Sequence, residues 1–301
     1  MKVRAKLKRI LWASYWLATL LGLSCPPIQA AVSVIDGSGA SVQLAQPARR
    51  IISLAPHLTE LLFTAGAGGQ IVATVDYSDY PSEALKIPRI GSNNAISYEA
   101  IVGLAPDLVL VWQSGNGPQM IARLKALGLN VYVDAPAGLD DIATTIEGLG
   151  QLAGTAEQGA QAAAQYRQTL ADLRRRYSGR QPLSVFYQVW DDPLLTLNGQ
   201  HLVSEVIQLC GGRNVFADAP ALVPKLSAES VIAANPQLMV ASGTQGERAR
   251  VLKQWRAWPM IDAVKTDRLY FLPPDLLVRH SPRLLQGAEI LCQQLEAARR
   301  Q

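Results

Sequence analysis

The sequence predicts an α/β protein made of two lobes, which are joined by one long helix and leave a ligand cleft between them. The first observation is an internal repeat, in which the stretches beginning at Ser97 and at Ser227 have closely similar sequences. In each, a serine at a helix-capping position precedes apolar residues at helical spacing, a proline ends the helix, and a short run rich in aliphatic residues follows. Each copy therefore predicts a helix followed by a buried strand.

The repeat also places an acidic side chain twice. Glu99 and Glu229 both stand two positions after the capping serine. If the two lobes are related by pseudo-symmetry, these carboxylates lie at equivalent helix starts.

The second observation is the regular alternation of helical and strand patterns on both sides of a central helical stretch. After an opening hairpin at 33–44, which turns at Asp36-Gly37, the first lobe is predicted to contain strands at 50–54, 71–75, 108–112 and 131–133 and helices at 58–64, 97–104 and 118–127. The second lobe is predicted to contain strands at 185–189, 238–241 and 269–272 and helices at 202–209, 227–234, 248–255 and 282–296.

The third observation is the stretch between the two lobes. From Leu139 to Tyr177 the chain is rich in Ala, Gln, Leu and Arg, which favours one long linking helix, bent near Gly150 and Gly154. The expected boundaries are residues 31–138 for the N-terminal lobe, 139–180 for the linking helix and 181–301 for the C-terminal lobe. The arginines that end this stretch suit a helix C-terminus, and a stiff linking helix predicts that the lobes close only slightly on a ligand.

The first thirty residues have the pattern of a signal peptide. Five basic residues precede an uncharged run from Ile10 to Leu23, and small residues follow at Ala30-Ala31. We therefore expect cleavage after Ala30 and export to the periplasm. Lipid anchoring through Cys25 is the alternative, which Gly22 disfavours because such signals usually have leucine at that position.

Removing this segment changes the charge of the chain. The segment holds five of the 28 basic residues and none of the 24 acidic ones, so the mature chain is close to neutral. The basic pI of about 9.0 thus gives no support for a nucleic-acid or membrane-surface partner.

Two cysteines remain after processing, Cys210 and Cys292. In an oxidising compartment we expect them to form a disulfide that ties the last helix to its own lobe. Two buried free thiols are the alternative.

Motifs of catalysis are not found in the sequence. It has no Gly-x-Ser-x-Gly, no phosphate-binding loop and no His-Glu-x-x-His, and the glycines at 66–69 are typical of a helix stop. The histidines His57, His201 and His280 are scattered along the chain, so we expect ordinary polar loop or cap residues, with no metal site and no cofactor.

Loops that follow the predicted strands are the expected binding surface. They are 77–81, 112–116, 190–193 and 275–279. With Tyr77, Trp112 and Trp190 they offer aromatic faces and hydrogen-bonding groups, which suit a large, partly apolar ligand. The alternative is that Trp112 and Trp190 are core residues that cover the ends of the sheets.

Several short motifs resemble the periplasmic cobalamin-binding proteins of ABC importers. They are Arg50-Ile-Ile-Ser-Leu-Ala-Pro56, Thr59-Glu60-Leu61, Tyr77-Ser-Asp-Tyr-Pro81, Ala105-Pro-Asp-Leu-Val109, Cys210-Gly-Gly-Arg-Asn-Val-Phe216 and Ser281-Pro-Arg283. The resemblance covers nearly all of the mature chain. It implies two Rossmann-like lobes of the class III periplasmic binding protein type, a transported corrinoid rather than a cofactor, and no enzymatic activity.

The resemblance also implies roles for individual residues. Tyr77 and the 275–279 loop, which consists of Asp275, Leu276, Leu277, Val278 and Arg279, would contact the corrinoid, and Cys210 and Cys292 would form the family's disulfide. Glu99 and Glu229 would pair with arginines of a permease dimer, which works with its ATPase subunits. A two-fold symmetric permease needs one such carboxylate from each lobe of a monomeric carrier; the alternative is that each glutamate only favours its helix N-terminus.

The chain departs from the family pattern at two positions. Asn93 and Val223 stand where stacking tryptophans are found in the family. Trp190 could restore one wall, or the pocket could accept a corrinoid precursor or a differently substituted cobamide. Haem or a ferric siderophore, with Tyr77 or Tyr80 as iron ligand, is the alternative cargo, and a periplasmic enzyme is a weaker alternative of another class.

Overall fold

Two parallel sheets of four strands form the framework of the protein. The computed structural model describes residues 31–300 apart from 93–94 and 244–245, so the expected signal peptide, with Cys25, lies outside the described residues. None of the helices in this described part has both the length and the apolar character that crossing a membrane requires.

The two sheets have the same strand order. In the N-terminal lobe the order is β4(Ile71–Ala73), β3(Ile51–Ser53), β7(Leu108–Trp112) and β8(Val131–Asp134); in the C-terminal lobe it is β12(Gly212–Asn214), β9(Leu183–Gln188), β13(Leu238–Ser242) and β14(Leu269–Leu272). In both lobes the first strand along the chain therefore lies between the second and the third, and all neighbours are parallel. This equivalence confirms the duplication that the sequence predicts.

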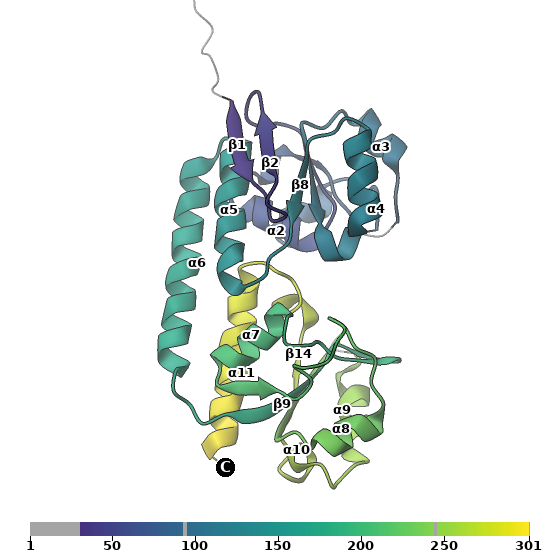
Figure 1. Cartoon of the computed structure of the whole chain (residues 1–301), viewed down its shortest axis with the longest axis vertical. Helices are drawn as coiled ribbons and strands as arrows, with labels where there is room; N and C mark the ends of the chain where they lie inside the picture. Colours follow the sequence, from purple (N-terminus) through teal and green to yellow (C-terminus); the bar gives the residue numbers. More distant parts are fainter. Residues whose placement is uncertain (1–30, 93–94, 244–245, 301) are drawn as a thin grey trace, which may run out of the picture. The chain divides into compact units, whose positions relative to one another are not determined.

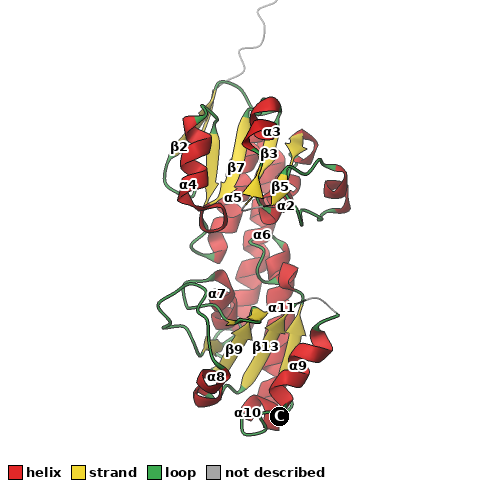
Figure 2. Ribbon diagram, turned by 90° about the vertical axis from the view of Figure 1, so that its right-hand side faces the viewer, coloured by secondary structure: helices red, strands yellow, loops and turns green. Residues whose placement is uncertain are grey.

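Helices cover both faces of each sheet (Figure 2). They are α2(Pro56–Thr64), α3(Tyr98–Gly103) and α4(Gln113–Ala126) in the first lobe, and α7(Leu202–Leu209), α8(Ala228–Ala234), α9(Arg248–Arg256), α10(Asp262–Lys265) and α11(Arg283–Arg300) in the second. Successive strand residues point to opposite faces, so in β7 Leu108 and Leu110 enter one cluster of buried residues while Val109 and Val111 enter another. Two buried faces explain why β7 is apolar throughout.

The shorter elements lie outside the two sheets. The expected hairpin is confirmed as β1(Val32–Ile35) paired with β2(Ser41–Leu44). Several short elements have no clear signal in the sequence. They are the two-residue pairs β5(Gly91–Ser92) with β6(Ala95–Ile96) and β10(Trp190–Asp191) with β11(Leu194–Leu195), the strand β12, and the short helices η1(Gly68–Gln70), η2(Ser82–Lys86), η3(Pro274–Leu276) and α10.

The connection between the lobes corrects one prediction. Residues 139–177 do not form a single helix but two, α5(Leu139–Ala153) and α6(Ala156–Tyr177), which lie side by side and antiparallel (Figure 1). Gly154 ends α5 in the left-handed conformation, with φ +72°, which glycine adopts without steric cost. Only α6 runs on into the second lobe.

The close packing of α5 on α6 depends on a pair of glycines. A Cβ atom on Gly150 would lie 3.0 Å from the Cα of Gly159, and one on Gly159 would lie 3.1 Å from the Cα of Gly150. Glycine at both positions therefore allows the two backbones to approach. The glycines that suggested a bend in one helix instead make a helical hairpin possible.

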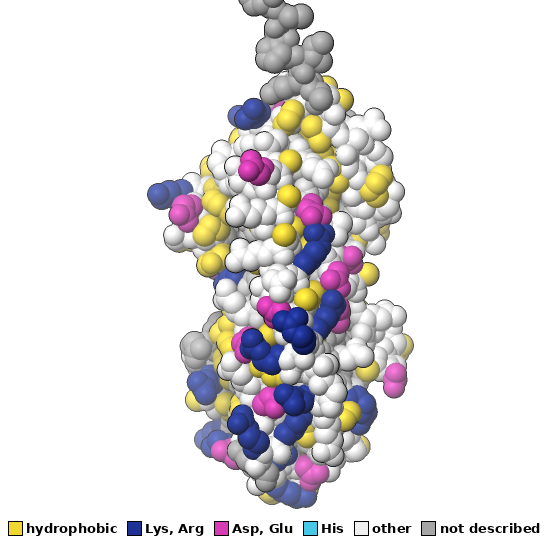
Figure 3. Space-filling view, turned by 90° about the vertical axis from the view of Figure 1, so that its left-hand side faces the viewer, with side chains coloured by type: hydrophobic (Ala, Val, Ile, Leu, Met, Phe, Trp, Pro, Cys, Tyr) yellow, Lys and Arg dark blue, Asp and Glu magenta, His cyan; other side chains and the backbone are white. Residues whose placement is uncertain are grey.

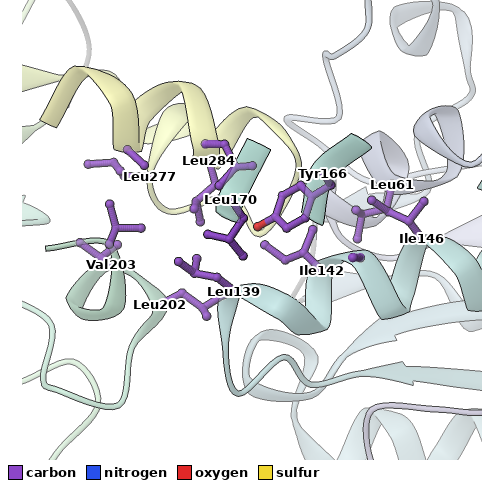
Figure 4. Packing of buried hydrophobic residues seen from close by; sticks show 14 of the residues in the cluster. Leu61, Leu139, Ile142, Ile146, Tyr166, Leu170, Leu202, Val203, Leu277 and Leu284 are labelled. Atoms are coloured by element: carbon purple, nitrogen blue, oxygen red, sulfur yellow. The ribbon is translucent and has the colours of Figure 1, made fainter. Parts of the chain in front are cut away.

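A single cluster of buried side chains extends through both lobes. Its members come from α2, α5, α6, α7 and α11, among them Leu61, Ile146, Leu170, Val203 and Leu284 (Figure 4). Because α6 contacts α2, α5, α7 and α11, the joint between the lobes is packed like a domain interior rather than like a flexible linker.

The solvent face around α6 carries mixed charges (Figure 3). The three arginines that end α6 each pair with carboxylates: Arg174 with Asp140 and Glu205, Arg175 with Asp172, and Arg176 with Glu289. The basic run lies in the last turn of α6, as the sequence predicted, and forms a solvent-facing surface of ion pairs.

The predicted disulfide is confirmed. The sulfur atoms of Cys210 and Cys292 are bonded, at 2.02 Å, and both residues are completely buried. The bond joins the C-terminal end of α7 to the middle of α11, within the second lobe.

Candidate cleft site

Three side chains of the first lobe gather at the carboxyl ends of its strands. Trp112 is the last residue of β7, Asp134 is the last residue of β8, and His57 is the second residue of α2, which follows β3. Parallel strands bring their carboxyl ends to one edge of a sheet, where α/β proteins bind ligands. The topology thus explains why residues far apart in sequence meet here.

The second lobe contributes the opposite wall of a pocket of about 340 Å³. His201, which caps α7, and His280, which precedes α11, border it. The full lining comprises Trp112, Gln113, Ser114, Ala135, Pro136, Ala137, Gln200, His201, Leu202, Leu222, Val223 and His280. Residues 112–137 and residues 200–280 belong to different lobes, so this pocket is the expected cleft, and we call it the cleft pocket.

Trp112 is held in place from several sides. Its backbone N–H donates to Asn116 Oδ1 at 2.7 Å, and Asn116 donates in turn to the carbonyl of Leu54 at 3.2 Å. The indole meets the rings of His57 and His280 edge-on, at centroid distances of 5.3 and 5.6 Å, and covers Gly115, where a Cβ atom would collide with it. Trp112 is partly buried, so it serves the core and the cleft pocket at once.

The segment after Trp112 corrects a second prediction. We expected 112–116 to be a loop, but α4 begins at Gln113, with a break at Gly117, whose φ is +78°. The break separates this first turn, which follows β7 directly, from the rest of α4, which begins at Pro118. Gln113 and Ser114 therefore reach the pocket from a helix start rather than from a loop.

The histidines correct a third prediction, because the fold brings all three together. The ring centroids of His57 and His280 are 5.4 Å apart, and those of His201 and His280 are 5.7 Å apart. His57 Nε2 lies 3.0 Å from Asp134 Oδ2. The expectation of a cap is confirmed for His201 alone, whose Nδ1 accepts from the N–H of Val203 at 3.1 Å. We call His57, His201, His280 and Asp134 the histidine cluster.

Burial keeps two of these imidazoles neutral. Burial lowers the pKa of His201 to about 4. Burial, together with the neighbouring His57 and His201, lowers the pKa of His280 well below its usual value. Both side chains therefore carry lone pairs at neutral pH.

The Tyr77–Pro81 motif has a clear structural basis. Ser78 is completely buried and ends a chain of hydroxyl contacts of 2.8 to 2.9 Å that runs through Thr74 and Thr59 to Ser53. Tyr80 lies under the guanidinium of Arg283, 4.1 Å from its ring centroid. Tyr77 is 78% exposed and has φ 63°, an uncommon conformation for an aromatic residue. The motif fixes this loop and leaves the Tyr77 ring in solvent.

Some residues of the 275–279 loop, which the sequence predicted as ligand contacts, instead hold the loop in the protein. Leu277 is completely buried in the shared core (Figure 4). Arg279 forms ion pairs with Glu60, Asp79 and Asp275 at 2.7 to 3.0 Å. Leu276 and Val278 are partly buried.

Glu60 is the centre of an ion-pair network that sequence reasoning missed. It is 2% exposed and accepts hydrogen bonds from Arg279, Ser281 and Arg283. Glu60 belongs to α2 of the first lobe and its partners belong to the second, so the network joins the lobes. The sequence did hold a clue to this network. Two of the family motifs, Thr59-Glu60-Leu61 and Ser281-Pro-Arg283, contain Glu60 and two of its hydrogen-bond donors.

The remaining sequence-predicted residues lie in different settings. Trp190 is 54% exposed, and its Nε1 donates to the carbonyl of Asp192 at 3.0 Å; it is not among the residues that line the cleft pocket. Val223 does line this pocket. Asn93 lies outside the described residues.

Glu99 and Glu229 occupy equivalent positions in the two lobes. Each lies in the first turn of its helix, α3 or α8, after a serine that caps the helix through its hydroxyl. Both glutamates are exposed. Hydrogen bonds from its own backbone amide and from Ser227 lower the pKa of Glu229. The predicted pair of matching carboxylates is therefore present in the structure.

Two of the other pockets have volumes of about 640 and 600 Å³. One is lined by Arg174, Arg180 and Arg213, among others, and the other by residues of α6 and α11. Neither includes a residue from the carboxyl ends of the central strands β3, β7, β9 and β13, where α/β lobes bind ligands, so we assign the site to the cleft pocket.

The chain is similar in sequence to known binding proteins. The vitamin B12-binding protein of Vibrio cholerae serotype O1 is 41% identical over 256 residues, which cover 85% of this chain and 92% of that protein. The vitamin B12-binding protein of Yersinia pseudotuberculosis serotype IB is 41% identical over 251 residues, which cover 83% and 88%.

Solved structures are similar as well. The crystal structure of the periplasmic vitamin B12-binding protein BtuF of Vibrio cholerae matches with a TM-score of 0.81 at 41% identity, over 85% of this chain and 99% of that one. The periplasmic haem-binding protein RhuT of Roseiflexus sp. RS-1 in its apo form matches with a TM-score of 0.72 at 28% identity, over 83% and 98%. The family model described as periplasmic binding protein matches residues 51–276. The chain belongs to the periplasmic binding protein family.

Proposed function

We propose that this protein binds cobalamin or a related corrinoid in the cleft pocket, in the periplasm, and delivers it unchanged to the permease of an ABC importer. The observation that carries the proposal is the extent of the likeness to vitamin B12-binding proteins, which covers more than four-fifths of the chain. The pocket lies where the carboxyl ends of the first sheet face the second lobe.

The cleft pocket has the mixed character that a corrinoid requires. Trp112, Leu222 and Val223 offer apolar surface, and Gln113, Ser114 and Gln200 offer hydrogen-bonding groups for peripheral amides. A corrinoid is larger than this pocket, so we propose that exposed aromatic residues beyond it, Tyr77 and Trp190, also contact the ligand.

The 275–279 loop has a divided role in this proposal. Leu276 and Val278 are available for apolar contact with the ligand, whereas Leu277 anchors the loop in the core. Asp275 and Arg279 hold the loop through their ion pair. In this proposal the loop contacts the corrinoid through its apolar residues, and its charged residues hold the loop in position.

We propose that Glu99 and Glu229 dock the protein on a two-fold symmetric permease. Both are exposed, and both occupy the same place on equivalent helices. Equivalent basic sites on two permease subunits would each receive one carboxylate. Because charges at an interface rim act chiefly on encounter and orientation, ligand affinity is expected to be independent of these glutamates.

Haem is the second candidate cargo, since a haem-binding protein at 28% identity shares the fold. The observation that favours it is the 78% exposed ring of Tyr77, a phenol that could serve as an axial iron ligand. A ferric siderophore is the related alternative.

Calorimetric titration of the purified mature protein distinguishes these cargoes. We expect saturable one-to-one binding of cyanocobalamin, and no comparable binding of haemin or a ferric siderophore. Trp112→Ala should weaken cobalamin binding about tenfold or more, because it removes the aromatic wall of the pocket. Trp258→Ala, at a tryptophan that packs against the outer core of the second lobe, is the control and should leave affinity unchanged. Tight binding of haemin without cobalamin binding would transfer the proposal to the second candidate.

A further inference from the structure

We infer that His57, Asp134 and His280 form a binding site for a divalent transition-metal ion, of the zinc class, that bridges the two lobes. This inference goes beyond the proposed corrinoid binding and does not depend on it. Two histidines and a carboxylate are a common ligand set for such ions.

The geometry brings one donor atom from each residue to the same place. These atoms all lie within 4.8 Å of one another. Ligands at about 2.1 Å from a tetrahedral zinc ion are about 3.4 Å apart, so side-chain movements on the order of 1 Å would complete the site. His57 and Asp134 are already 3.0 Å apart.

His280 is the observation that points most directly to a ligand. It is 6% exposed, and both of its ring nitrogens are buried without a hydrogen-bond partner among the described residues. A buried polar group without a partner is costly. The contact between His57 and Asp134 accounts for those two residues but leaves His280 unexplained, whereas a shared metal ion accounts for all three.

The surroundings of Asp134 match those of a metal ligand. While one carboxylate oxygen faces His57, the other accepts a hydrogen bond from Thr145 Oγ1 at 3.1 Å. Such outer hydrogen bonds fix the orientation of ligating carboxylates. Asp134 is 1% exposed, so its charge lies in a setting where a cation would be strongly attracted.

The ligand set and the access route indicate which ions would bind. Two imidazoles favour zinc, nickel, cobalt or copper over magnesium and calcium, which prefer oxygen ligands. His280 also lines the cleft pocket, which gives an ion a path from solvent. An ion held by His57 and Asp134 of the first lobe and His280 of the second would connect the lobes.

The test is calorimetric titration with Zn²⁺ of the mature protein, purified without a histidine tag and freed of metal with a chelator. We expect saturable one-to-one binding. His280→Gln and Asp134→Asn should each weaken it more than about 100-fold, and Thr145→Val, which removes the outer hydrogen bond to Asp134, about tenfold. Asp267→Asn, at an exposed carboxylate of the second lobe, is the matched control and should bind Zn²⁺ as the parent does.

Absence of saturable binding, or parental binding by both His280→Gln and Asp134→Asn, would overturn the inference. Thermal melting of each variant establishes that it is folded. A second readout does not require substitution of a metal-binding residue. Co²⁺ or Cu²⁺ should quench the fluorescence of Trp112, whose ring centroid lies 5.3 and 5.6 Å from those of His57 and His280. In Trp112→Phe the quenched part of the fluorescence should be missing. Unquenched Trp112 fluorescence would equally count against the site. Neither readout involves a corrinoid, so the outcome is independent of the proposed function.

Discussion

Trp112 shows how one residue can be a wall of a pocket and part of a core. Its ring rests on Gly115 and between two histidines, and Asn116 holds its backbone. The two readings that the sequence left open, a ligand contact or a core residue at the sheet edge, are therefore compatible. The position of the indole depends on the absence of a side chain at residue 115.

Gly115→Ala tests this dependence. The added methyl group would collide with the indole, so the ring must move and cobalamin affinity should fall about tenfold, with the fold retained. The measurement is calorimetric titration. Gly103→Ala in α3, where an added Cβ meets no atom within 4 Å, is the control. Equal affinities for the two variants would show that the position of Trp112 does not matter.

His201 makes stability depend on pH. Its pKa in the folded protein is about 4, below the value of about 6.5 in an unfolded chain. Below pH 6.5 the unfolded state therefore binds a proton that the folded state excludes, so stability is lost as the pH falls toward 4. We expect this group to reduce the free energy of unfolding by about 1–2 kcal/mol between pH 7 and pH 5.

The measurement is urea unfolding at both pH values, with a chelator present. His201→Asn keeps a hydrogen-bond acceptor at the cap of α7 and removes the titrating ring, so its loss of stability should be smaller than that of the parent. The same loss in both proteins would exclude His201 as the cause.

At the scale of secondary-structure elements, the connection between the lobes shows that composition can predict helix without predicting the path of the chain. Composition favours helix throughout 139–177, and both segments are indeed helical. The reversal depends on one left-handed glycine, Gly154, and on the glycine contact between α5 and α6. A glycine that bends a helix and one that ends it look alike in sequence. Which of the two occurs here depends on the tertiary packing of α6 against α5.

The Glu60 network couples elements of different lobes and yields a third prediction. Glu60→Gln removes a buried charge that faces Arg279 and Arg283. Arg279 keeps Asp79 and Asp275, but Arg283 loses its carboxylate partner. We expect a loss of about 3 kcal/mol in the free energy of unfolding. Glu147→Gln, which breaks the partly exposed pair with Arg167, should cost less than about 1 kcal/mol. Denaturant unfolding compares the two, and similar losses would contradict a structural role for the network.

At the scale of the whole molecule, the internal repeat explains both the two similar lobes and the pair of glutamates proposed for docking. The repeat that begins at Ser97 and Ser227 predicted two lobes of the same topology, and the two sheets have the same strand order. The equivalent glutamates follow from the same duplication.

The fourth prediction tests these glutamates together. Glu99→Lys combined with Glu229→Lys should abolish cobalamin uptake by cells that contain the cognate importer, while calorimetric affinity for cobalamin is unchanged, because only the docking charges are reversed. Glu157→Lys is the control, since Glu157 is also an exposed residue in the first turn of a helix, α6. Uptake that persists in the double variant would refute the docking role.

The sequence predicted the fold more fully than the site. Strands and helices were found because apolar periodicity and capping residues are local signals, and β7, β14 and α7 have the predicted bounds. The histidine cluster and the Glu60 network escaped because their members are 77 and more than 200 residues apart, and only the strand order brings them together. The disulfide was predicted because the two cysteines that follow the expected signal peptide leave one pairing.

The central claim is that a corrinoid binds between the lobes, at the carboxyl ends of the first sheet. A crystal structure of the mature protein with cyanocobalamin tests it most directly. We predict that the corrinoid lies in the cleft pocket, against Trp112 on one side and Val223 on the other. A corrinoid bound elsewhere, for instance in the pocket lined by Arg174 and Arg213, would contradict the account.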